Sequence, residues 1–92
     1  MYVVEAARMG NRENHTYIVG VYTSMRVAAI AALSEEYYRG GKYECYITQH
    51  TPDQVVIEKS EYLVDKCLVN PNELENEIEF MIKRIKAEFI NE

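Results

Sequence analysis

Ser24 and Arg26 stand where a strand-like run gives way to a helix-like segment. The run Tyr17–Tyr22 is rich in β-branched and aromatic residues, and apolar residues after Ser24 recur at helical spacing. A helix N-terminus presents unpaired backbone N–H groups and partial positive charge, to which Arg26 adds a cation. The corner is therefore a candidate site for a small anion or a nucleotide. The alternative is a capped corner with Arg26 in solvent, because no glycine-rich phosphate-binding loop precedes the helix.

Two cysteines and two histidines are the residues most able to act as nucleophile, base or zinc ligands. Cys45 and His50 lie five residues apart on one predicted strand, an odd spacing that points their side chains to opposite faces. Neither Cys45 and Cys67 nor His15 and His50 have the short spacing of zinc sites. We therefore expect no catalytic residue, no metal, no cofactor, and a protein that is not an enzyme. Cys45 is expected to be a buried thiol, and whether it meets Cys67 stays open.

An amphipathic helix is predicted over about residues 71–91. The stretch Asn70–Glu73 has the pattern of an N-cap, a first-turn proline and a capping-box glutamate. Phe80 lies about 240° around this helix from Leu74, with Ala87 close beside it. Phe80 and Ala87 are therefore candidate interface residues, for a second copy or for another protein. The apolar stripe, which is predicted to pack on a sheet, comprises Leu74, Ile78, Met81, Ile82, Ile85 and Phe89.

Several strands are expected before this helix. The segments Tyr2–Arg8 and Tyr17–Tyr22 flank a polar loop, which favours a hairpin. Gly20 within the second segment indicates a bulge or a close backbone approach. A third strand is predicted over Tyr43–His50, and further extended segments are predicted within 54–69.

A central helix is predicted over Met25–Arg39. Ser24 is its expected N-cap, and Gly40-Gly41 is expected to end it, because glycine accepts the left-handed conformation that follows a helix. Its apolar stripe is predicted to comprise Val27, Ile30, Ala31, Leu33, Tyr37 and Tyr38, with Ala28, Ala29 and Ala32 to the sides, where small residues allow close packing.

These elements predict an α+β fold. A small antiparallel sheet of three to five strands is expected to be covered on one face by the helix at about 25–39 and by the long C-terminal helix at about 71–91. The chain of 92 residues is expected to form a single domain. That domain would contain a β-β-α-β unit over 1–53, extended segments over 54–69 and the amphipathic helix over 70–92.

Charge is unevenly distributed along the chain. The net charge is −5, yet residues 1–50 sum to zero, so the excess of acidic groups lies in residues 51–92. Without a basic stripe, binding to a nucleic-acid backbone is not expected. The alternate glutamates Glu73, Glu75, Glu77 and Glu79 could imitate phosphates, but such a run is also the ordinary solvated face of an amphipathic helix.

No apolar run approaches the roughly 20 residues that span a bilayer, so no membrane segment is expected. The N-terminus also lacks the charged and apolar regions of a secretion signal. A cytoplasmic location is therefore expected.

Residues 1 to about 53 resemble a family of short phage and bacterial proteins of unknown function. The resemblance rests on YVVE, on IVGVYTS leading into an alanine-rich helix, and on YECYITQH. It implies a small β-β-α-β unit, a phage-related origin and a place in the host cytoplasm, and it implies no catalytic residues. Similar sequences tend to place acidic residues after the cap serine, where this chain has Met25 and Arg26. The C-terminal helix lies outside the resemblance.

Taken together, these observations favour a small non-enzymatic protein–protein interaction module. Eight tyrosines supply amphipathic contact area, and an amphipathic helix is added to the core unit. A phage-related accessory protein that binds and modulates a host protein is the expectation that the resemblance adds. Self-association as a homodimer is compatible with the same features. The alternative is a protein that binds a small anion or nucleotide at Ser24-Arg26.

Overall fold

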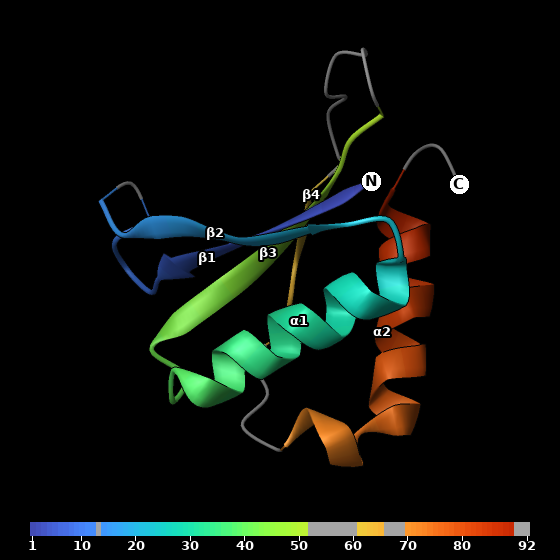
Figure 1. Cartoon of the computed structure of the whole chain (residues 1–92). Coiled ribbons are helices and arrows are strands. Elements are labelled where there is room, and N and C mark those ends of the chain that lie inside the picture. The colour runs from blue at the N-terminus through green and yellow to red at the C-terminus, as the bar shows by residue number, and fades with distance from the viewer. Residues whose placement is uncertain (13, 52–60, 66–69, 90–92) are drawn as a thin grey trace.

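The computed structural model describes residues 1–12, 14–51, 61–65 and 70–89. The described part of the chain forms four strands, two α-helices and one short 3-10 helix (Figure 1). The strands make one antiparallel sheet in the order β2-β1-β3-β4, which confirms the predicted α+β fold. The elements in chain order are β1 (Tyr2–Arg8), β2 (Thr16–Tyr22), α1 (Met25–Tyr38), β3 (Tyr43–Gln49), β4 (Glu61–Leu63), η1 (Pro71–Glu73) and α2 (Glu75–Glu88).

Both α-helices lie against the same face of the sheet, and α2 runs steeply across the end of α1 (Figure 1). The central pair β1 and β3 supplies the sheet side of the core. Val4 pairs with Ile47 and Ala6 with Cys45, and these four side chains are fully buried beneath the helices. Alternate residues of the same strands face the other side of the sheet, as the period of two in a strand requires.

The hairpin of β1 and β2 contains the bulge that Gly20 indicated. Val4 pairs with Gly20 but Glu5 pairs with Ile18, so Val19 is the additional residue in β2. A Cβ atom on Gly20 would lie 2.6 Å from Cζ of the Tyr22 ring, which explains the absence of a side chain there. The predicted bulge is confirmed, whereas the atoms that approach Gly20 belong to the Tyr22 side chain and not to another backbone.

Helix α1 buries a different face from the predicted one. Val27 is 48% exposed and Tyr38 lies largely in solvent. The alanines expected at the sides of the stripe instead form the buried face, because small side chains let the helix backbone approach the sheet closely. That face comprises Met25, Ala28, Ala29, Ala32, Leu33 and Glu36.

The ends of α1 are as predicted. Oγ of Ser24 accepts a hydrogen bond from the backbone N–H of Val27 at 3.3 Å. At the other end, Gly40 and Gly41 have φ angles of 64° and 77°. Their N–H groups donate to the carbonyl oxygens of Tyr37 and Glu36, which closes the helix.

The N-terminal boundary predicted for the C-terminal helix is wrong. Pro71–Glu73 forms a 3-10 turn, in which the N–H of Glu73 donates to the carbonyl of Asn70 at 3.0 Å. Helix α2 begins only at Glu75, and Leu74 caps it without a side-chain hydrogen bond. The predicted capping residues therefore precede a 3-10 turn and do not stand at the start of α2, because the chain first tightens into i→i+3 bonds.

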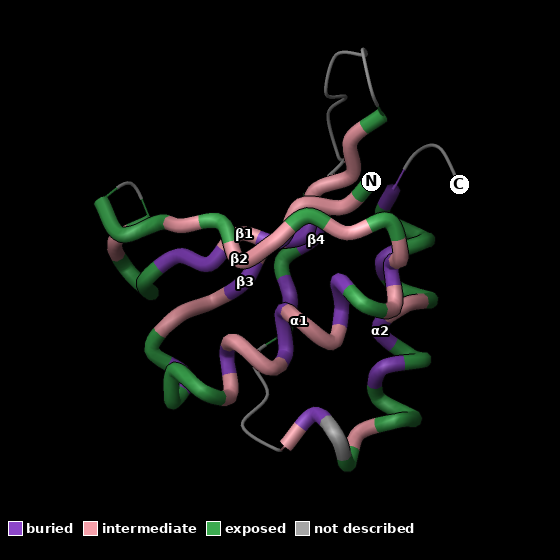
Figure 2. Tube along the Cα trace, viewed as in Figure 1, coloured by how far each residue is buried: buried purple, intermediate pink, exposed green. Residues whose placement is uncertain are grey.

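Most of the predicted apolar stripe is buried, although Leu74 and Ile82 are only half-buried. Ile78, Met81, Ile85 and the following Phe89 are buried, and the ring of Phe89 stacks on Tyr2 of β1 at a centroid distance of 6.2 Å. Figure 2 shows this side of α2 buried, with exposed residues on the outer side. The predicted extended segments over 54–69 are described only at 61–65, and Cys67 lies outside the described residues.

Candidate interaction surface on helix α2

Phe80 lies on α2 outside the buried stripe, as predicted, and its side chain is 60% exposed. It stands at the rim of a cavity of about 220 Å³ between α1, β4 and α2. This volume is below the roughly 300–1,000 Å³ of typical small-molecule sites, so the cavity suits one large side chain better than a cofactor. The residues that line it are Leu33, Tyr62, Asp65, Leu74, Glu77, Phe80, Met81 and Arg84.

The lining of this cavity combines an apolar floor with charged groups. Leu33 and Met81 are both buried, while Glu77 is exposed on the first turn of α2. Arg84 donates to a carboxylate oxygen of Asp65 at 2.7 Å and ties α2 to the segment after β4. An apolar pocket edged by a few polar groups is the usual form of a recognition site.

Ala87, the other predicted interface residue, is exposed two turns beyond Phe80 on the same side of α2. It does not line the cavity. The two predicted residues therefore share a helix side, but only Phe80 lies beside a hollow that a partner could fill.

The Ser24-Arg26 corner has carboxylates as neighbours. The guanidinium of Arg26 contacts Glu75 and Glu79, both on the outer side of α2. The positive charge that was expected to attract an anion is thus already matched within the chain. Two of the four alternate glutamates, Glu75 and Glu79, are thus held in ion pairs with α1.

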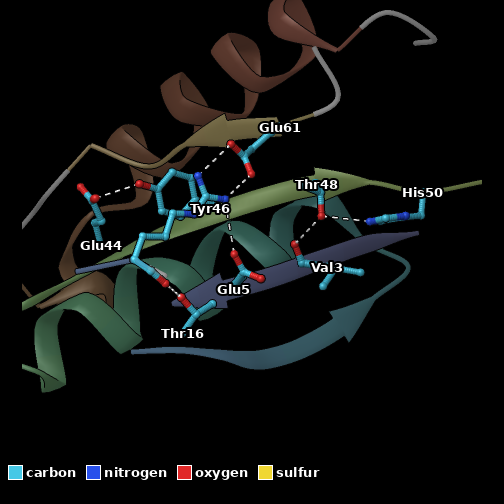
Figure 3. A network of polar contacts seen from close by, with 9 residues as sticks. Val3, Glu5, Thr16, Glu44, Tyr46, Thr48, His50 and Glu61 are labelled. Atoms are coloured by element: carbon cyan, nitrogen blue, oxygen red, sulfur yellow. Dashed lines mark hydrogen bonds and ion pairs between the residues drawn. The ribbon is translucent and has the colours of Figure 1, made fainter. Parts of the chain in front are cut away.

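Cys45 is buried in the core beneath the helices, as expected. Burial, with help from the nearby carboxylates of Glu36 and Glu35, raises the pKa of Cys45 to about 12. The thiol is therefore protonated near neutral pH and is a poor nucleophile. His50 lies near the end of β3 and contacts Oγ1 of Thr48 at 3.1 Å on the opposite face (Figure 3), so it does not approach Cys45.

Within the described residues, no three His, Cys, Asp or Glu side chains gather closely enough to hold a metal ion. In the same residues, no helix is both long enough and apolar enough to cross a membrane.

The face of the sheet away from the helices carries a polar network around Glu5, Tyr46 and Glu61 (Figure 3), and all three are contacted by Arg12. Its guanidinium lies 3.7 Å from the centre of the Tyr46 ring, and it donates to Glu61 at 2.6 Å and to Glu5 at 3.4 Å. Tyr46 in turn donates to Glu44 at 2.8 Å. These contacts link the β1–β2 loop to β1, β3 and β4, so the network holds the loop against the sheet.

A second cluster joins α1 to the strands. The hydroxyl of Tyr17 donates to Glu35, and Nε of Arg39 donates to the same carboxylate at 3.0 Å. Burial and the Glu35 hydrogen bond raise the pKa of Tyr17 to about 12. Burial alone would raise the pKa of Glu35, but the donors Tyr17 and Arg39 lower it overall. We assign the cluster a structural role, because the Glu35 carboxylate is paired with the Arg39 guanidinium and bonded by the Tyr17 hydroxyl.

Sequence reasoning found Phe80 but missed the rest of the cavity. Tyr62 points to the core, but the segment Glu61–Leu63 contains no sign of this, because the neighbouring Leu63 is equally apolar and yet is exposed. No local pattern could have placed Leu33 or Asp65 beside α2, because these residues meet it only in the folded chain.

A scan against protein-family models found no match, and searches of curated proteins and of solved structures found no significant match.

Proposed function

We propose that this protein is a small non-enzymatic protein–protein interaction module whose partner binds at the Phe80 cavity. The observation that carries the proposal is a phenylalanine that is 60% exposed at the rim of an apolar hollow of about 220 Å³. Aromatic residues beside pockets are the usual anchors of protein interfaces. A buried, protonated Cys45 also supplies no nucleophile for an enzyme.

The lining of the cavity indicates what the partner presents. A large apolar side chain would fill the space between Leu33, Tyr62 and Met81 and stack against Phe80. Glu77 lies at the same site, and the excess acidic charge of the chain falls in residues 51–92. A basic residue next to the apolar anchor would therefore be attracted to this surface.

The first experiment selects peptides from a random display library on the immobilised full chain. Peptides that bind should contain a large apolar residue with a lysine or arginine close by. Phe80→Glu should weaken their binding by about tenfold or more, because it places a charge against the apolar anchor. Glu77→Lys should weaken the same peptides by repelling their basic residue.

The matched control is Val27→Glu, which introduces the same charge at an exposed residue of α1 that does not line the cavity. Circular dichroism should show that all variants keep the fold. Selected peptides that bind Phe80→Glu as well as the parent chain would refute the proposal, and so would a selection that yields no binder.

The wider role follows the resemblance of residues 1–53 to short phage and bacterial proteins. On that basis the partner is a host protein, and binding modulates its action in the host cytoplasm. This part of the proposal has only the resemblance as support. The alternative of an anion or nucleotide at Ser24-Arg26 gains no support from the arrangement, because Glu75 and Glu79 already contact the arginine.

A further inference from the structure

Strand β2 lies at one edge of the sheet. In the order β2-β1-β3-β4, it pairs with β1 on one side, and no described strand lies on its other side. An edge strand presents backbone N–H and C=O groups that another strand can bind. The opposite edge is formed by β4, which has three residues, whereas β2 has seven.

The side chains of β2 do little to protect this edge. Natural edge strands are commonly protected by lysine, by proline, by short length or by a β-bulge, and of these four β2 has only the bulge. The seven residues of β2, TYIVGVY, contain no charge and no proline. Ile18 and Val21 are 57% and 54% exposed. A long, uncharged and partly apolar edge strand is favourable for pairing with a further strand.

Because of the bulge, β2 presents the same kinds of side chain on each face when it is read in either direction. Ile18 pairs with Glu5 and Val21 pairs with Val3, so both side chains face away from the helices. Residues three apart would lie on opposite faces of a regular strand, and the additional Val19 brings these two to the same face. Tyr17 and Tyr22 both pack toward the core on the helix side.

This pattern is symmetric about the centre of the strand, between Val19 and Gly20. When two copies of β2 lie antiparallel about that centre, Ile18 of one copy lies opposite Val21 of the other, on the open face. Tyr17 then lies opposite Tyr22 of the second copy, on the helix face. Paired residues in an antiparallel ladder must share a face, and here every such pair does.

The distribution of charge also allows two copies to approach each other at β2. Each chain carries a net −5, but residues 1–50 sum to zero and the strand itself is uncharged. Two copies that meet at β2 therefore avoid the like-charge repulsion that the acidic C-terminal part would create.

We propose that two copies of this chain associate through antiparallel pairing of their β2 strands, which would extend the four-stranded sheets into one continuous sheet of eight strands. The proposal is independent of the Phe80 cavity, which lies between α1, β4 and α2.

The test is the molar mass of the full chain in solution, measured by sedimentation velocity over a range of concentrations. We expect a species of twice the 10.7 kDa chain mass at high concentration. Ile18→Lys and Val21→Lys should each weaken association about tenfold or more, because each replaces an apolar cross-strand contact with a charge, the substitution by which edge strands resist pairing. Both residues are more than half exposed in the single chain, so the fold should persist.

Two control variants separate this contact from others. Val27→Lys places the same charge at a similarly exposed valine on α1, and Phe80→Glu alters the cavity on α2. Both should leave the dimer unchanged. A monomer at every concentration would overturn the proposal. A dimer that resists both β2 variants would also overturn it, as would one that dissociates with Phe80→Glu instead.

Discussion

At the scale of single residues, Glu36 is the most unusual group in the core. It is fully buried, and its Oε2 accepts a hydrogen bond from the backbone N–H of Cys45 at 2.8 Å. The carbonyl of Cys45 accepts from the N–H of Val64 at 2.9 Å. Strand β4 ends at Leu63, so a helix side chain supplies the acceptor that a longer strand would have supplied.

Replacing Glu36 by alanine should therefore lower the free energy of unfolding by about 1–3 kcal/mol, because a buried N–H loses its acceptor. Glu36→Gln keeps an acceptor oxygen and should cost less. Urea denaturation measures both values. Glu88→Ala, at an exposed position at the end of α2, is the control and should change the stability little. Equal losses for Glu36→Ala and Glu88→Ala would show that the hydrogen bond contributes nothing.

At the scale of elements, the close approach of α1 to the sheet depends on its alanines. Ala28, Ala29 and Ala32 have no exposed surface, and they face the strands from successive turns of the helix. Space for a larger side chain is therefore lacking along this face.

Ala29→Leu should destabilise the protein by about 1–3 kcal/mol, since additional methylenes in a packed core force the helix away from the sheet. Ala31→Leu makes the same change at a half-buried position and should have a smaller effect. Thermal unfolding followed by circular dichroism gives both values. A stabilising Ala29→Leu would mean that a void exists between α1 and the strands.

The element boundaries show why some features were predictable. The aromatic and β-branched start of YVVEAAR and the alternation in YECYITQ predicted two central strands to within a residue, because a strand in this fold has one face to bury. Helix α1 carries apolar residues on two sides, so periodicity alone favoured the larger ones. The choice between the sides depends on how closely the helix lies to the sheet, which is a property of the folded chain. The same reason applies to the cavity: Phe80 was visible on a helical wheel, but its neighbours were not.

At the scale of the whole molecule, two helices cover one face of the sheet and leave the other face to the polar network around Glu5, Tyr46 and Glu61 (Figures 1 and 3). The smallest dimension is 18 Å, which fits two layers. The sequence suggested a β-β-α-β unit with an additional helix, but α2 supplies buried residues to the same core as β1 and β3. The C-terminal helix is therefore part of the domain's only described core.

The chain should consequently unfold in one cooperative step. Ile85 of α2 is fully buried, so Ile85→Ala should lower the free energy of unfolding by about 2–5 kcal/mol. The lower stability should appear equally in the unfolding of the strands and of α1, because the strands, α1 and α2 share one core. Arg26→Met removes only partly exposed ion pairs between α1 and α2 and should cost about 1 kcal/mol or less.

Urea unfolding of Ile85→Ala, followed by both tyrosine fluorescence and circular dichroism, tests this view. All eight tyrosines lie in the strands and α1 and none in α2, so tyrosine fluorescence reports on the sheet and α1, whereas circular dichroism reports mainly on the helices. Coincident curves that shift together would establish that α2 folds with the sheet. Curves that separate, with helix signal lost before the tyrosine change, would show instead that α2 detaches first. In that case the Phe80 cavity would exist only while α2 is docked, and binding of a partner there would stabilise the docked state by mass action.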